Sequence, residues 1–202
     1  MALERSRQKK SVEVITDTDK ARVLVDPMRR EIVRLLSLRP MTESELAEKL
    51  GLSDPSVNHH LKIIAGAQLI RLARKEVEQH GIVQKFYETT ASIFLVDGRS
   101  MPLEIERYFM PVRLERALGV IATLSLAMKE PLRVSTEDVE DFAKALDSAI
   151  IETAHNYPRQ KNEDRENIIR KIYRDALMRL RRKTGLLPES IRRLLTTETK
   201  GR

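Results

Sequence analysis

Apolar residues recur at helical spacing in consecutive segments of the first third of the chain. The first segment spans 27–38 and ends before an Arg-Pro pair, which disfavours helix. The second follows Thr42, which forms a capping-box pattern with Glu45, and it ends at Gly51, a residue suited to the position just past a helix. The two segments therefore predict a pair of short amphipathic helices.

A third segment, residues 54–66, predicts a helix with one apolar and one polar face. Its N-cap is expected at Ser53 or Asp54, with Pro55 in the first turn, where a missing N–H costs nothing. On a helical wheel one side carries Val57, Leu61 and Ile64. The opposite arc carries Pro55, Ser56, Asn58, His59 and Lys62. We therefore expect the aliphatic side chains to face the core and the polar set to face outward.

The rest of the chain shows two other kinds of pattern. Two β-prone segments joined by Gln-His-Gly predict a hairpin over 70–88. Beyond it the chain is expected to be helical, and residues 117–128 are apolar nearly all round, which predicts burial on several sides. We expect three parts: a basic N-terminal tail at 1–19, of which residues 1–11 look frayed, a helix-and-hairpin domain at 20–97 and a helical region at 98–202.

The order helix, helix, short turn, helix, hairpin is typical of a winged helix-turn-helix domain. The third helix of such a domain enters the major groove of DNA, and the hairpin wing lies along the backbone or the minor groove. The predicted fold class is mainly α with a small β-hairpin wing (α+β), followed by a helical C-terminal dimerisation region. A homodimer would place two recognition helices about 34 Å apart on an imperfect palindrome.

The polar residues of the third helix and the hairpin suit contact with DNA. Asn58 can pair with N6 and N7 of adenine, Ser56 can contact a base edge or a phosphate, and His59 can donate from a ring nitrogen. Basic side chains neutralise phosphates, which supplies much of the affinity through counterion release. The candidate DNA-binding residues are Thr42, Ser53, Asp54, Pro55, Ser56, Asn58, His59, Lys62, Arg71, Arg74, Lys75, His80 and Lys85.

Some neighbouring residues fit this role less well. Glu76 and Glu78 would repel phosphate unless they face away, which would leave the tip around His80 to approach the duplex. His60 lies on the flank of the apolar side, so we expect it to pack or hydrogen-bond inside the domain.

The composition narrows the function further. The net charge of +7 suits a polyanionic partner. The absence of cysteine excludes disulfides, thiolate metal sites and cysteine nucleophiles, and favours a cytoplasmic location. No apolar run is long enough to span a membrane, and no secretory signal is present. Few Asn and Gln and many charged residues are typical of thermophilic sources.

Three stretches resemble the ArsR-type winged-helix transcription regulators: "DPMRREIVRLL", "MTESELAEKLGLSDPSVNHHLKIIAGAQLI" and "QKFYETT". The resemblance covers residues 20–95, is greater to archaeal members than to the bacterial metal sensors, and implies a dimeric repressor or regulator with recognition helix 54–66. The family's metal-sensing cysteine motif is missing, which excludes thiolate metal sensing. Gln68 stands where the family usually has glycine, so the sequence does not determine how the third helix is capped at its C-terminal end. The helical C-terminal half has no counterpart in the minimal family members.

Other functions compatible with the same elements are a sequence-tolerant architectural DNA-binding protein and a winged-helix protein-interaction module. Residues 170–193 hold nine Lys or Arg against Asp175 and Glu189, and this segment is either an exposed helix face or an additional DNA contact. Glu152 and His155 share a helical face, but no other ligand stands near, so no metal or cofactor is expected. No phosphate-binding Gly-rich loop, nucleophile elbow or carboxylate pair is present, so we expect no enzyme.

Overall fold

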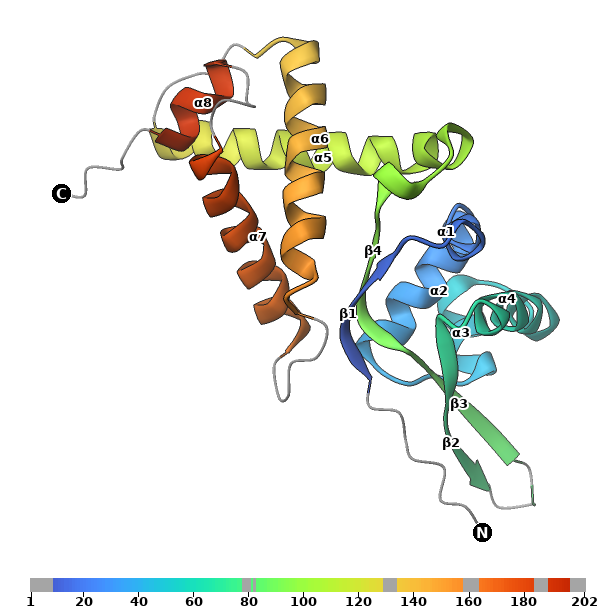
Figure 1. The fold of residues 1–202 in the computed structure, drawn as a ribbon. Helices are drawn as coiled ribbons and strands as arrows, with labels where there is room; N and C mark the ends of the chain where they lie inside the picture. The colour runs from blue at the N-terminus through green and yellow to red at the C-terminus, as the bar shows by residue number, and fades with distance from the viewer. Residues whose placement is uncertain are drawn as a thin grey trace. The chain divides into compact units, whose positions relative to one another are not determined.

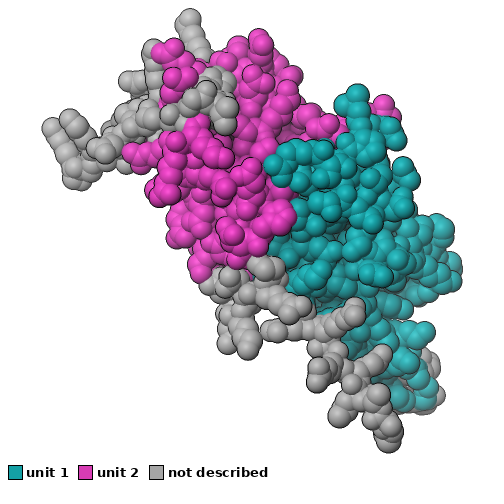
Figure 2. All heavy atoms as spheres, viewed as in Figure 1, with its two compact units in different colours: residues 1–105, 158–162 teal, residues 106–157, 163–202 magenta. Residues whose placement is uncertain are grey.

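The computed structural model describes residues 9–77, 81, 83–128, 134–157, 164–183 and 189–196. Residues 193–196 are described by their backbone only. The chain forms two compact units (Figure 2). The first contains the described residues up to Ile105, and the second contains Glu106–Tyr157 and the described residues from Asp164 onward. Within the described ranges, no helix has the length and apolar character needed to cross a membrane.

Three consecutive helices of the first unit confirm the predicted pattern (Figure 1). They are α2 (Pro27–Leu38), α3 (Glu43–Leu50) and α4 (Asp54–Gly66). The side chains of Asp26 and Thr42 cap α2 and α3, and Ser53 occupies the N-cap position of α4 without a side-chain capping hydrogen bond. The apolar face of α4 is buried through Val57, Leu61 and Ile64. The aliphatic spacing therefore fixes which side of α4 remains outside.

The predicted hairpin is also present. Strand β2 (Ile70–Val77) pairs antiparallel with β3 (Val83–Thr89), and the pairing is irregular between Leu72 and Arg74. Met41, just before α3, bridges to Tyr87 of β3, which ties the hairpin to the helices. A mainly helical fold with a small hairpin wing is therefore confirmed.

The N-terminal segment differs from the prediction. Strand β1 (Lys10–Ile15) pairs in parallel with β4 (Ala91–Val96), and helix α1 (Thr18–Val23) follows it. Val12 and Ile15 are buried in this pairing. The prediction of a frayed segment over 1–11 is therefore wrong for residues 10 and 11, and the tail expected over 1–19 contains β1 and the start of α1. The apolar side chains of β1 gain enough cover from the sheet to order the chain. Residues 1–8 lie outside the described part.

The end of α4 has an unusual backbone. Gln68 has φ of 58°, and it is the only non-glycine residue with positive φ in the described part of the chain. Glycine would adopt this conformation more easily, because a side chain disfavours the left-handed region. The amide N–H of Leu69 still reaches the carbonyl of Ile64, at 3.2 Å, so the chain turns sharply into β2.

Gln68→Gly is expected to raise the free energy of unfolding by about 0.5–1 kcal/mol, because relief of the left-handed strain exceeds the added freedom of the unfolded chain. Urea denaturation followed by far-UV circular dichroism measures this change. Gly51→Ala is the matched control, since Gly51 has φ of 64° and should respond in the opposite direction. Destabilisation by Gln68→Gly would contradict the assignment of strain.

The second unit is helical. It contains α6 (Thr136–Ala154), α7 (Arg165–Arg182), α8 (Glu189–Thr196) and most of α5 (Leu103–Met128). Helices α6 and α7 pack along one another, and α8 contacts both. The core formed by α6 and α7 includes Phe142, Leu146, Ile150, Ile172, Ala176 and Leu180. Ser135 caps α6, as expected from the sequence.

Helix α5 is less covered than its sequence suggests. Within 117–128, Ala117 and Ile121 are buried, but Leu118 is 51% and Leu126 is 80% exposed. The expectation of burial on several sides is therefore wrong for the single chain, because the described helices of the unit cover α5 on one side only. The uncovered side is an apolar surface.

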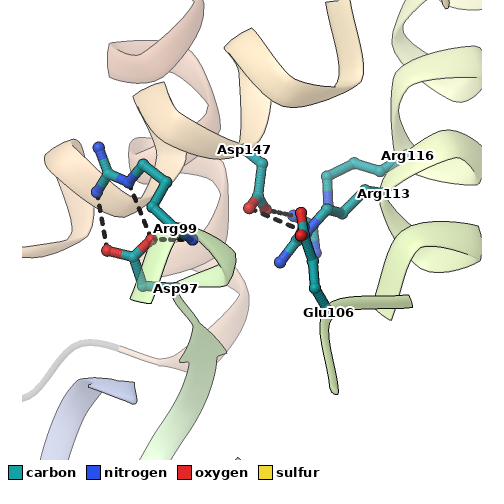
Figure 3. Close-up of polar contacts among 6 residues, drawn as sticks. All are labelled: Asp97, Arg99, Glu106, Arg113, Arg116 and Asp147. Carbon is teal, nitrogen blue, oxygen red and sulfur yellow. Dashed lines mark hydrogen bonds and ion pairs between the residues drawn. The ribbon is translucent and has the colours of Figure 1, made fainter. Parts of the chain in front are cut away.

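A cluster of charged side chains connects α5 to α6 within the second unit (Figure 3). Arg113 is 6% exposed, and its Nε lies 3.0 Å from Oδ2 of Asp147. Its Nη1 lies 3.1 Å from Oε1 of Glu106, and Nη1 of Arg116 lies 3.2 Å from Oδ1 of Asp147. Asp147 is thus the shared acceptor of two guanidinium groups.

Candidate nucleic-acid interface

The outward arc of α4 remains accessible. His59, Pro55 and Lys62 are exposed, and Ser56 and Asn58 are half-buried. None of these side chains is enclosed by the first unit. Since Lys62 is the only charged residue among them, the arc is polar but nearly uncharged, and it offers side-chain donors and acceptors that can contact base edges.

Helix α3 braces α4 through polar contacts as well as apolar ones. Oγ of Ser44 donates to Oδ2 of Asp54, at 3.1 Å. Nδ2 of Asn58 donates to Oε2 of Glu43, at 2.6 Å. Glu43 was not among the residues selected from the sequence, because the amphipathic pattern of one helix gives no signal for a contact between two helices.

The candidate residues at the starts of α3 and α4 differ in their exposure to solvent. Thr42 is buried, and its Oγ1 accepts from the backbone N–H of Glu45 at 3.2 Å, so its hydroxyl caps α3. Thr42 is therefore engaged within the fold and is not part of the accessible surface. Ser53 and Asp54 are exposed at the start of α4, and the hydroxyl of Ser53 makes no capping hydrogen bond.

Glu45 completes the capping box and makes the stability of α3 sensitive to pH. Burial raises the pKa of Glu45, but hydrogen bonds from the backbone N–H of Thr42 and from Arg39 lower it more, so the pKa is below its ordinary value of 4.5. The carboxylate therefore stabilises the fold above this value, and the contribution is lost as the pH falls through the lowered pKa.

Glu45→Gln is expected to reduce the loss of stability on acidification. Unfolding midpoints measured from neutral pH to below 4.5 should fall less steeply in the variant than in the unaltered protein. Glu48→Gln, an exposed position on the same helix, is the control. Equal slopes for all three proteins would contradict this role of Glu45.

The hairpin separates its charges onto two faces. Lys75 is paired directly with Lys85, and both are exposed. Glu76 is one residue further along and so lies on the other face, where it forms an ion pair with Arg74. Like charges directly opposite one another repel, so Lys75 and Lys85 destabilise each other. A phosphate bound between them would reduce this repulsion.

The other basic residues of the hairpin are already engaged. The guanidinium of Arg74 lies 3.9 Å from the centre of the Phe86 ring. Arg71 pairs with Glu88 across the strands, with Nε 2.9 Å from Oε1. Arg71 and Arg74 therefore stabilise the hairpin, whereas Lys75 and Lys85 have no such partner among the contacts of the described residues.

Other predicted features have separate outcomes. Glu78 and His80 lie outside the described residues. His60 is half-buried, and its Nδ1 is buried without a hydrogen-bond partner in the part of the chain that is described. Glu152 pairs with Arg179 of α7, and no group of three metal-binding side chains occurs among the described residues.

The basic segment at the end of α7 belongs to the second unit. Arg181, Arg182 and Lys183 are exposed there, while Ile172, Ala176 and Leu180 form the buried side of the helix. A pocket of about 570 Å³ lies beside this segment and is lined by residues of α6 and α7, including Thr153, Met178 and Arg182, and by Asn156, which follows α6. None of the candidate DNA-binding residues lines it.

Comparison with known proteins agrees with this geometry. Residues 26–71 match the family described as bacterial regulatory protein, arsR family, and they span α2, α3, α4 and the start of β2. The chain is 41% identical over 54 residues to the transcriptional repressor SdpR of Bacillus subtilis (strain 168). That match covers 27% of this chain and 60% of SdpR. Both matches are to regulatory proteins, and residues 26–71 are therefore similar to the helix-turn-helix region of the arsR family.

Proposed function

We propose that the chain is a sequence-specific DNA-binding transcription regulator that acts as a homodimeric repressor. Helix α4 enters the major groove, and the hairpin wing of β2 and β3 lies on the backbone or the minor groove. The observation that carries the proposal is the accessible, nearly uncharged polar arc of α4 within a region similar to the arsR-family helix-turn-helix. The similarity to a transcriptional repressor supports repression, by occupation of promoter DNA.

The proposed contacts fall into two groups. Ser56, Asn58 and His59 face base edges, because they offer neutral donors and acceptors on the exposed arc. Phosphates are contacted by Lys62 and by the wing pair of Lys75 and Lys85. Arg71 and Arg74 stabilise the wing through their ion pairs with Glu88 and Glu76. Ser53, Asp54 and Pro55 place the first turn of α4 at the groove edge.

Replacing both Lys75 and Lys85 with alanine is expected to weaken DNA binding and its salt dependence together. Removal of one phosphate interaction reduces the slope of log affinity against log salt by about 0.9. Fluorescence anisotropy over a range of salt concentrations measures this slope. Lys49→Ala, an exposed lysine of α3 outside the proposed surface, is the control. An unchanged slope in the double variant would remove the wing lysines from the interface.

The homodimer is proposed to form through α5. Its exposed apolar side chains include Val112, Leu118 and Leu126, and a second copy of the same helix offers a complementary apolar surface. A symmetric dimer also supplies the second recognition helix, about 34 Å from the first, that an imperfectly palindromic site requires.

Selection of bound duplexes from a random pool tests the proposed function. The unaltered protein is expected to enrich an imperfect palindrome with half-sites about 10 base pairs apart. Enrichment of no sequence, despite retention of DNA, would indicate a sequence-tolerant architectural protein. Failure to retain any duplex would leave a protein-interaction module as the function of the winged helix.

A further inference from the structure

The amide of Asn58 is already engaged before any DNA is bound. Its Nδ2 donates to Oε2 of Glu43 at 2.6 Å, and both side chains are half-buried between α3 and α4. A carboxylate only accepts hydrogen bonds. The nitrogen of the Asn58 amide must therefore face Glu43, which fixes the orientation of the amide group.

Counting donors and acceptors shows what remains for a base. An asparagine amide has two N–H donors and one carbonyl acceptor. Glu43 takes one donor, so one N–H and the carbonyl oxygen remain. Adenine offers the matching pair in the major groove, the N7 acceptor and the N6 donor, whereas guanine offers two acceptors, N7 and O6. The amide held by Glu43 therefore complements adenine and lacks the second donor that guanine would need.

We infer that Glu43 is a positioning residue that makes Asn58 select adenine over guanine. The inference rests on the proposed function, because it requires α4 to lie in the major groove. Glu43 itself makes no base contact in this account and acts through the orientation of the Asn58 amide.

The position of Glu43 gives this role a second signature. Glu43 is the first residue of α3, and its carboxylate also lies near Tyr87 of β3. Burial raises the pKa of Tyr87, and the negative charge of Glu43 raises this pKa further. A negative charge between the recognition helix and the wing repels phosphates. Removing Glu43 should therefore increase affinity for all duplexes while reducing selectivity at one base, a combination that loss of folding cannot produce.

The experiment uses the full-length protein and the duplex enriched from the random pool. The base read by Asn58 is the position at which Asn58→Ala loses preference. At this position, adenine and guanine duplexes are compared by fluorescence anisotropy for the unaltered protein, Glu43→Ala, Glu43→Gln and Glu48→Ala. Glu48→Ala removes the same charge from an exposed site on α3, and Glu43→Gln keeps an acceptor for the Asn58 amide.

The unaltered protein, Glu43→Gln and Glu48→Ala are expected to prefer adenine on the order of ten- to a hundredfold, and Glu43→Ala by about threefold or less. Adding Glu43→Ala to Asn58→Ala should not change the ratio further. Three results would overturn this inference while leaving the proposed function intact. Glu43→Ala could keep the full adenine preference, or the unaltered protein could prefer guanine. Glu43→Ala could also change the ratio of adenine to guanine affinity equally in the Asn58→Ala background. A protein that shows no sequence preference would overturn the proposed function as well.

Discussion

Asp147→Ala is expected to lower the free energy of unfolding of the second unit by about 3–5 kcal/mol, because it leaves a buried guanidinium without its main partner. Arg113 is 6% exposed, and its Nη2 is already buried without a hydrogen-bond partner within the described residues. Without Asp147, Glu106 would be the one carboxylate left in an ion pair with Arg113 among the described residues. Urea denaturation followed by far-UV circular dichroism measures the effect.

Two further variants separate this explanation from a general loss of packing. Arg113→Met is expected to cost less, about 1–2 kcal/mol, because Asp147 retains Arg116 and a methionine fills much of the same space. Asp141→Ala, at an exposed position on the same helix, should have almost no effect. If Arg113→Met were as damaging as Asp147→Ala, the buried unpaired cation would not be the cause.

The second large effect is expected at the recognition helix. Replacing Asn58 and His59 together with alanine should reduce the preference for the selected duplex over a scrambled one by roughly ten- to a thousandfold, since each good base contact contributes about 1–3 kcal/mol. Competition measured by fluorescence anisotropy gives the two affinities. His59 is exposed, and Asn58 is half-buried and loses one hydrogen bond, to Glu43, while the apolar face of α4 is untouched, so the fold should remain intact.

Lys62→Ala provides the contrast. Lys62 is exposed on the same arc and is assigned to a phosphate, so its loss should weaken binding to both duplexes about equally and leave their ratio unchanged. A change in the ratio for Lys62→Ala, together with an unchanged ratio for the double variant, would reverse the assignment of base and phosphate contacts.

Local signals in the sequence were sufficient for helices α2, α3 and α4 of the first unit, whereas α1 was not predicted. Thr42 and Glu45 form the predicted capping box, and α2 and α4 have the predicted bounds because proline and capping residues act within one turn of the chain. Strand β1 was missed because its partner, β4, lies about eighty residues away, and no local pattern indicates a pairing of this range.

The candidate site was predictable to a similar degree. The helical wheel placed Asn58 and His59 on the outer arc of α4, which depends on one helix alone. The contact of Glu43 with Asn58 and the pairing of Lys75 with Lys85 depend on how two elements meet, so neither has a residue-level signal in the sequence. The exposure of α5 was misjudged for the same reason, since periodicity does not specify what covers a helix.

The outer arc of α4 is proposed to read DNA sequence, and the rest of the functional account depends on this role. The ratio of affinities for the selected duplex and a scrambled duplex of equal length, measured at physiological salt, tests it most directly. A specific regulator is expected to prefer the selected duplex by about 10³ or more. Equal affinity for the two duplexes would contradict the account.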